Sequence, residues 1–183
     1  RPVQTGTEGG GDRQRVIDLL ELPKERWQPE AYAFQAPVSP HWAAEREGQC
    51  IDPDQLQLPS IDGPLVVETA GGLMVPLTRH WLQIQQLERW QLPVVLVARS
   101  GLGTLNHTLL SLEALRRRNI PILGLVINGP HHADNPRTLN ELSDVPVLCE
   151  LPPLVPLKAP ALARQWQVQN VKAKVETEIN RFQ

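Results

Sequence analysis

Four short apolar segments, each bounded by turn residues, constrain the fold of this 183-residue chain more than any other feature. They cover residues 64–68, 93–98, 121–128 and 145–151 and are rich in Val, Ile and Leu. Apolar runs of this length are typical of strands that are buried on both faces of a parallel sheet. Three of the four begin at or directly after a proline, which lacks the N–H that a central strand position donates.

Helical patterns separate these segments. Apolar residues recur at helical spacing over residues 81–90, and a cleaner leucine stripe at 105, 109, 112 and 115 ends in the arginine run 116–118. We interpret the arginine run as a solvated helix end that complements the helix dipole. The alternation of strand and helix predicts an α/β fold, with a mostly parallel sheet flanked by helices.

The remaining segments predict shorter elements within one domain over residues 1–183. We expect helices over residues 12–20 and 37–47, the second with Ser39 as its cap, and a loop or marginal helix over 50–61. The charged tail over residues 168–183 predicts a C-terminal helix that packs on the domain edge or on a partner.

Composition excludes several classes of protein. A formal net charge of -2 and a pI near 6.2 argue against nucleic acid as a partner. No apolar run reaches membrane-spanning length and the first residues do not resemble a secretion signal, so we expect a cytoplasmic protein without a membrane partner. Cys50 and Cys149 lack a metal-binding spacing and are expected to be free thiols.

One acidic residue stands out in this pattern. Glu68 ends the first apolar run and is followed at once by Thr69-Ala70-Gly71-Gly72. In open parallel sheets ligands bind beyond the carboxyl ends of the strands, where glycines let backbone approach them, so the stretch predicts a metal or phosphate site. The alternative is a glutamate that simply leads into solvent, and this stretch alone favours neither interpretation.

The chain begins abruptly. Its first twelve residues, RPVQTGTEGGGD, look like a strand end that runs into a glycine-rich loop. We therefore expect a preceding strand–helix–strand unit of roughly 30 residues or more to be missing.

Six segments, taken in order, resemble dethiobiotin synthetase. They are RPVQTG with the following Asp12, AFQAPVSPHWAA, VVETAGGLMVPL, LPVVLVARSGLGTLNHTLLSLEAL, ILGLVING and LPPL, and they span roughly residues 1–155. The stretch GLGTLNHTLL is the most specific of them. The resemblance implies a P-loop NTPase-like fold and an ATP- and Mg²⁺-dependent enzyme of biotin biosynthesis. Such an enzyme joins CO2 to 7,8-diaminononanoate, through a carbamate and a carbamic-phosphoric anhydride, and closes the ring of dethiobiotin.

The resemblance also implies roles for individual residues. Asp12 and Glu68 match the two carboxylates of the magnesium–nucleotide site. Arg1 falls where the family has a lysine that contacts the carbamate and the transferring phosphate, and is the candidate catalytic residue. Thr5 matches a hydroxyl residue that touches the substrate.

Further matches concern the nucleotide and the substrate carboxylate. Those for the nucleotide are Thr69, Ala70 and Gly71 near the phosphates, Asn128 and Gly129 at the adenine edge, and Pro152, Pro153 and Leu154 beside the base. The helix start at 101–106, with Gly103 and Asn106, matches the place where the family binds the substrate carboxylate across a dimer interface. A homodimer is therefore expected.

The sequence departs from the family at three points. Thr69 replaces a glycine, Arg1 replaces a lysine, and the phosphate-cradling loop with its lysine and threonine is absent. We therefore expect these 183 residues alone, without that loop, to be inactive. Three hypotheses stay open: a shortened cyclo-ligase, a non-catalytic dimerising or small-molecule-binding relative, and another member of the same nucleotide-binding superfamily.

Structural interpretations compete with several of these roles. Asp12 would also serve as a helix cap after a flexible glycine run, and Asn128 would also end its strand by bonding to neighbouring backbone. His107 is interpreted as an interface or capping residue. His131 and His132 lack a third ligand by sequence, so zinc is not expected there.

Overall fold

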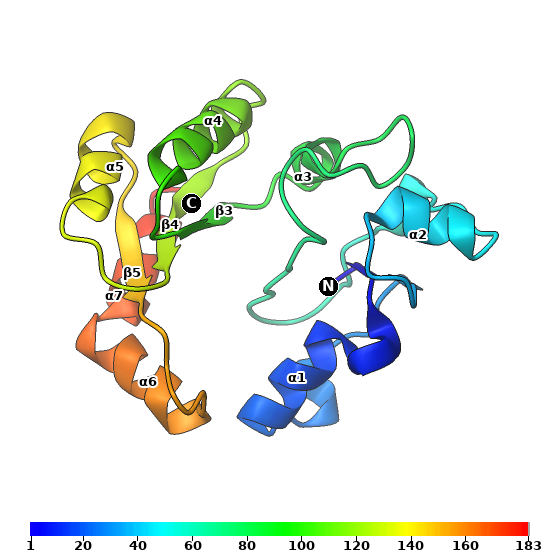
Figure 1. The fold of residues 1–183 in the computed structure, drawn as a ribbon, viewed down its shortest axis with the longest axis horizontal. Coiled ribbons are helices and arrows are strands. Elements are labelled where there is room, and N and C mark those ends of the chain that lie inside the picture. Colours follow the sequence, from blue (N-terminus) through cyan, green and yellow to red (C-terminus); the bar gives the residue numbers. More distant parts are fainter. Residues whose placement is uncertain (183) are drawn as a thin grey trace. The chain divides into compact units, whose positions relative to one another are not determined.

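A computed structural model gives the structure of the chain and describes residues 1–182. The chain divides into two compact units, Arg1–Trp90 and the residues from Gln91 onward, and each is described by itself. Figure 1 follows the elements of each unit along the chain. The single nucleotide-binding domain over residues 1–183 stays a prediction.

The first unit is built mainly from short elements and long connections. Its two strands, β1 (Val3–Gln4) and β2 (Tyr32–Ala33), pair in parallel. Its helices are α1 (Gly11–Leu20), α2 (Pro40–Arg46) and α3 (Gln83–Trp90), with 3₁₀ turns at Thr7–Gly9, Lys24–Arg26 and Pro53–Gln55. The helices predicted over 12–20, 37–47 and 81–90 are therefore confirmed with shifted bounds.

A compact apolar cluster organises this unit. Phe34 has no exposed surface and packs in the same cluster as Val3, Ile51, Leu56 and Ala70. The cluster joins β1 to the segment that follows β2 and to the loops before and after residue 60. Connections that carry little regular structure are thus held in place by side-chain burial.

The strand predicted over residues 64–68 is wrong. The structure has no strand there, and the side chain of Val66 is 91% exposed. A strand needs a neighbour to satisfy its N–H and C=O groups, and among the described residues of this unit the one ladder joins β1 to β2. Without a ladder, the apolar run forms an extended connection.

The expected cap of α2 is also different. Ser39 does occupy the N-cap position, but its side chain makes no capping hydrogen bond. Its hydroxyl instead lies 3.1 Å from Nδ1 of His41. Pro40 begins the helix and lacks an N–H, so one of the donors that a cap would satisfy does not exist.

The second unit has the predicted α/β architecture. Its elements are β3 (Val94–Arg99), α4 (Thr104–Arg116), β4 (Ile122–Asn128), α5 (Asn135–Ser143), β5 (Val147–Leu151), α6 (Ala159–Val168) and α7 (Val171–Ile179). The strands form one parallel sheet in the order β3-β4-β5. The strands predicted near 93–98, 121–128 and 145–151 are confirmed.

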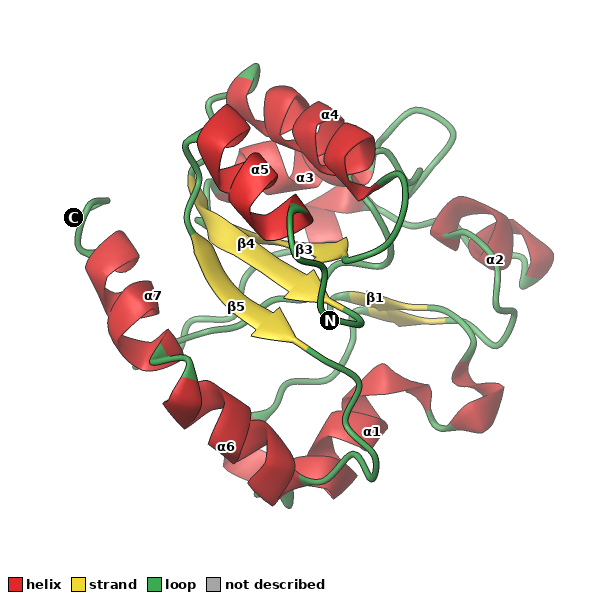
Figure 2. Ribbon diagram, turned by 60° about the vertical axis from the view of Figure 1, so that its left-hand side comes forward, coloured by secondary structure: helices red, strands yellow, loops and turns green. Residues whose placement is uncertain are grey.

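Helices cover both faces of β4 and β5, whereas Val95 and Val97 of β3 are exposed, so the expected burial of every strand on both faces is wrong for β3. Helices α4 and α5 lie over one face, and α7 packs against β4 and β5 on the other (Figure 2). Leu112, Leu125, Ile127 and Leu139 form the buried layer under α4 and α5, so the leucine stripe of α4 belongs to the core. None of the helices within residues 1–182 combines the length and apolar character that crossing a membrane requires.

The C-terminal helix predicted over 168–183 is shorter than expected. Val168 ends α6, and the next helix, α7, begins at Val171. Asn170 between them has φ 51°, a left-handed conformation that ends a right-handed helix. The sequence pattern predicted one helix because the apolar spacing continues through this break.

Candidate functional site

The first candidate site is a charged cluster of Arg1, Asp12 and Glu68 in the unit Arg1–Trp90. The guanidinium of Arg1 donates from Nη1 to Oδ2 of Asp12 and from Nη2 to Oε1 of Glu68, the latter at 2.5 Å. The Arg1 side chain is 14% exposed, whereas those of Asp12 and Glu68 are 40% and 61% exposed. One largely buried cation therefore pairs with two partly exposed carboxylates from distant parts of the sequence.

Gln4 on β1 hydrogen-bonds to two members of this cluster, Arg1 and Asp12. Its side chain is buried, accepts a hydrogen bond from Arg1 Nη1 at 3.2 Å and donates to Asp12 Oδ2 at 3.3 Å. The Nε atom of Arg1 is also buried, and no acceptor among residues 1–182 contacts it. The strand therefore fixes the positions of Arg1 and Asp12 relative to one another. Sequence reasoning missed Gln4, although a glutamine inside RPVQTG was a visible signal.

Local backbone conformation brings Asp12 and Glu68 to Arg1. Gly10 and Gly11 have φ of 93° and 71°, which places Asp12 in the first turn of α1. Ala70 is buried in the cluster around Phe34, so it anchors the loop that carries Glu68.

The loop after Glu68 turns sharply at Gly71. This glycine has φ 88°, and a Cβ there would lie 3.0 Å from Val75 Cγ2. Thr69, which replaces the family's glycine, donates from Oγ1 to the Gly71 carbonyl at 2.9 Å. The threonine therefore closes the turn itself. Thr5 follows β1, is partly buried, and its carbonyl accepts a hydrogen bond from Gln4 Nε2.

The cluster fits one mode of magnesium binding. Within residues 1–182 no three His, Cys, Asp or Glu side chains gather to hold a metal by themselves. Mg²⁺ usually takes one or two carboxylates and completes its shell with waters and substrate phosphates. The Asp12 and Glu68 carboxylates meet at a single cation and are hard oxygen donors, so they fit that pattern.

The second candidate site is a cavity of about 290 Å³ in the unit that begins at Gln91. It lies at the carboxyl ends of β4 and β5, and two of the predicted nucleotide residues, Gly129 and Pro152, line it. This is the place where parallel sheets bind ligands. Gly129 has φ 136°, and a Cβ there would lie 2.4 Å from Ser100 Oγ, so the position requires glycine.

The other predicted base residues lie beside this cavity without lining it. Asn128 is exposed at the end of β4, where its carbonyl accepts a hydrogen bond from Ser100 N at 3.1 Å. Its side-chain amide has no hydrogen-bond partner among residues 1–182. Pro153 and Leu154 follow Pro152 directly and are not among the lining residues.

The predicted substrate residues Gly103 and Asn106 lie at the start of α4. Gly103 is the N-cap, with φ 88° and no side-chain cap, and Asn106 lies in the first turn. The neighbouring Leu102 is fully exposed. A helix start of this kind presents free backbone N–H groups, which favour an anion.

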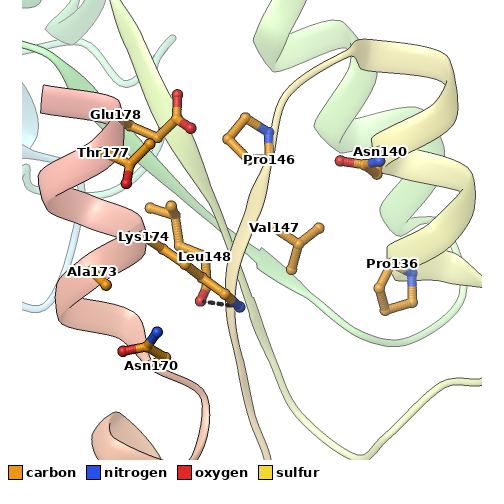
Figure 3. A pocket seen from close by; sticks show the side chains of 10 residues that line it. All are labelled: Pro136, Asn140, Pro146, Val147, Leu148, Asn170, Ala173, Lys174, Thr177 and Glu178. Carbon is orange, nitrogen blue, oxygen red and sulfur yellow. Dashed lines mark hydrogen bonds between the residues drawn. The ribbon is translucent and has the colours of Figure 1, made fainter. Parts of the chain in front are cut away.

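A second and larger cavity in this unit has no part in these predictions. It measures about 470 Å³, lies between α5, β5 and α7, and is lined by none of the predicted site residues. Figure 3 shows Lys174 on α7 reaching the carbonyl of Leu148 on β5, a contact of 3.2 Å. We place the candidate nucleotide site at the smaller cavity, because that one lies at the carboxyl ends of the strands.

Comparison with known proteins decides the family. A family model described as an AAA domain matches residues 1–161. The ATP-dependent dethiobiotin synthetase BioD of Rhodopseudomonas palustris strain HaA2 is 53% identical over 162 residues, which cover 88% of this chain and 76% of that protein. This chain belongs to the dethiobiotin synthetase family.

Two further relatives are similar to this chain. The dethiobiotin synthetase of Brucella anthropi is 47% identical over 91% of this chain and 79% of its own length. A biotin biosynthesis bifunctional protein BioCD of Bordetella avium is 50% identical over 88% of this chain and 35% of its own length. The match to the AAA family model ends at residue 161, so the rest of α6 and all of α7 lie outside it.

Proposed function

We propose that this chain is an ATP-dependent dethiobiotin synthetase. It would join CO2 to 7,8-diaminononanoate, as the resemblance of its motifs to the dethiobiotin synthetase family implies. The observation that carries the proposal is the convergence of Asp12 and Glu68 on the Arg1 guanidinium. Relatives with about half of their residues identical support it. An ATP-consuming biosynthetic step also fits a cytoplasmic location.

The reaction proceeds in three steps: carbamate formation, phosphoryl transfer and ring closure. One substrate amine adds to CO2 and loses a proton to give a carbamate. A carbamate oxygen then takes the γ-phosphoryl group of ATP, so that ADP leaves and a carbamic-phosphoric anhydride forms. The second amine attacks the carbonyl carbon, phosphate leaves with the bonding electrons, and loss of a proton completes the cyclic urea.

The charged cluster meets the demands of the second step. Phosphoryl transfer between two anions needs fixed positive charge more than it needs a covalent group from the protein. Arg1 supplies that charge in a place set by Gln4. Asp12 and Glu68 would hold Mg²⁺, which neutralises the phosphates that it binds. In the structure Arg1 pairs with both carboxylates. Once Mg²⁺ occupied these carboxylates, the guanidinium would be released to contact the phosphoryl group.

The remaining predicted residues serve binding. Thr69, Ala70 and Gly71 offer backbone to the phosphates, and Asn128, Gly129, Pro152, Pro153 and Leu154 receive the base. Gly103 and Asn106 bind the substrate carboxylate at the start of α4, and Thr5 contacts the substrate. The active form is a homodimer, and sedimentation of the active protein as a monomer would contradict that part of the proposal.

The test is product formation. The protein is incubated with 7,8-diaminononanoate, bicarbonate, ATP and MgCl2, and dethiobiotin is followed by mass spectrometry. We expect one dethiobiotin for each ATP consumed, and no product without the diamine. Binding of ATP without any product would instead favour the non-catalytic relative. Product formed by these 183 residues alone would show that the sequence-based expectation of inactivity, drawn from the missing phosphate-cradling loop, is wrong.

A further inference from the structure

Two glutamines at the end of α6, Gln165 and Gln169, line the 290 Å³ cavity. Both lie beyond residue 161, where the match to the AAA family model ends. None of the site residues predicted from the sequence comes from this segment. Part of the cavity wall is therefore supplied by a segment that the AAA family model does not cover.

Gln169 clamps the strand end that leads to Pro152. Its Nε2 donates to the carbonyl of Glu150 at 2.6 Å, and its Oε1 accepts from the N–H of Glu150 at 2.7 Å. These are the two bonds that another strand would make with β5. Because the backbone offers one donor and one acceptor, the pair also fixes which end of the Gln169 amide is nitrogen.

This orientation sets that of Gln165. The second hydrogen of Gln169 Nε2 points to Gln165 Oε1, at 3.1 Å. The oxygen of Gln165 is therefore used as an acceptor, and its Nε2 lies at the other end of the amide. Nothing within residues 1–182 accepts a hydrogen bond from that nitrogen. A donor of fixed orientation is thus left at the cavity wall.

The other lining residues indicate what kind of group this donor meets. Ile127, Pro130 and Pro152 are apolar, while Glu150 contributes a carboxylate that lies 3.2 Å from His131 Nδ1. The lining, as far as residues 1–182 form it, contains no Lys or Arg. Such a wall disfavours a phosphate and suits a neutral heterocycle with an acceptor on its edge.

We propose that Gln165 donates a hydrogen bond from Nε2 to a ring nitrogen of the adenine base, and that Gln169 is the positioning residue for both Gln165 and the Glu150–Pro152 strand end. This inference rests on the proposed function, because that function supplies the nucleotide. It assigns part of base recognition to the segment that follows residue 161.

The first test isolates the donor. Gln165→Glu keeps an oxygen for Gln169 Nε2 but removes the amide hydrogens. Binding of ATP and of its 1-deaza, 3-deaza and 7-deaza analogues is measured by calorimetry. In the parent protein we expect one analogue to bind about threefold to tenfold more weakly than ATP, as for the loss of one hydrogen bond. The variant should bind ATP more weakly by a similar factor and should no longer distinguish that analogue.

The second test isolates positioning. Gln169→Leu should raise KM for ATP about tenfold, a factor that corresponds to about 1.4 kcal/mol, and leave kcat and KM for the diamine within about twofold. Gln167→Leu is the matched control, because Gln167 lies on the same helix, is exposed and does not line the cavity. Its kinetic constants should equal those of the parent.

The outcomes separate this inference from the proposed function. If ATP binds and Gln165→Glu retains the parent's discrimination among the analogues, the base does not contact Gln165 and the inference is overturned while the enzyme assignment stands. If no dethiobiotin forms but the analogue pattern changes as described, the inference stands without the proposed reaction. Equal losses for Gln169→Leu and Gln167→Leu would remove the positioning role.

Discussion

In the unit Arg1–Trp90 charged side chains tie distant segments together, whereas in the unit that begins at Gln91 a parallel sheet does so. Arg1 pairs with Glu68, Arg13 with Glu30, Arg79 with Glu45 and Arg89 with Asp54, all far apart in sequence. In the second unit Arg117 pairs with Glu113, Arg137 with Glu141 and Arg181 with Glu178, three or four residues away on the same helix or at its end.

This difference teaches where each unit is sensitive. Local pairs on a helix surface add little to stability. Among the long-range pairs, Arg1–Glu68 and Arg13–Glu30 have a largely buried arginine and should contribute more, and both depend on an ionised carboxylate. The first unit should therefore respond to changes in its apolar cluster and also to pH, while the second should respond mainly to changes in its core.

The largest effect should come from the apolar cluster of the first unit. Phe34→Ala removes a ring with no exposed surface and should lower the free energy of unfolding of this unit by about 3–5 kcal/mol. Tryptophan fluorescence in urea reports on it, because Trp27, Trp42, Trp81 and Trp90 lie there. Val66→Ala is the control: a 91% exposed side chain should cost under about 0.5 kcal/mol. A cost above about 1.5 kcal/mol would mean that residues 64–68 are buried after all.

The next effect concerns the charged cluster. Glu68→Gln removes one carboxylate from the pair held by Arg1 and should lower kcat by about 10²- to 10³-fold, as for the loss of one fixed electrostatic contact. The measurement is the dethiobiotin assay at saturating ATP. Glu45→Gln, which breaks the exposed pair with Arg79, is the matched control and should leave kcat unchanged. Equal rates for both variants would remove Glu68 from the mechanism.

A free thiol in each unit gives a third comparison. Cys50 is exposed, whereas Cys149 is buried and burial raises the pKa of its thiol. Because the thiolate is the reacting form, Cys149 should react with N-ethylmaleimide at least about tenfold more slowly than Cys50 at pH 7. Peptide mass spectrometry separates the two rates. Labelling of both at one rate would show that the second unit opens readily around β5.

The smallest effect should come from the Arg13–Glu30 pair. Burial raises the pKa of Glu30, but the hydrogen bond and charge of Arg13 outweigh burial, so this pKa lies below its ordinary value of 4.5. The pair therefore stabilises the fold fully above the pKa of the unfolded chain and loses its effect as pH falls through the folded pKa. Glu30→Gln should cost about 1 kcal/mol at pH 7 and less at pH 3. Urea titrations at both pH values measure the difference, and a cost that does not change with pH would contradict the role of charge.

The same contrast explains which elements the sequence predicted. Strands β4 and β5 and helix α4 were predicted because a parallel strand that is covered on both faces consists of a continuous run of Val, Ile and Leu. Strand β3 was predicted from the same signal, although its Val95 and Val97 are exposed. Residues 64–68 carry the same signal without forming a strand, since pairing depends on a neighbouring segment and not on the run itself. Helices α5 and α6 were missed, although each has a proline in its first turn.

The candidate site divides in a similar way. The meeting of Asp12 and Glu68 followed from the motif resemblance, and the structure does bring both to one cation. That this cation is Arg1, held by Gln4, could not be predicted, because spacing says nothing about which of several charges will pair. The roles of Gln165 and Gln169 could not be predicted for another reason. Glutamine is common on surface helices, and only the fold brings Gln169 into contact with Glu150 and Gln165.

The clamp on Glu150 has a further consequence for the behaviour of the chain in concentrated solution. Strand β5 ends the three-stranded sheet, and an open border of this kind invites pairing with a second molecule. Gln169 occupies the outward N–H and C=O of Glu150, and Lys174 occupies the carbonyl of Leu148. These two side chains fill hydrogen-bonding positions that a strand of a second molecule would need, and so disfavour self-association into fibres.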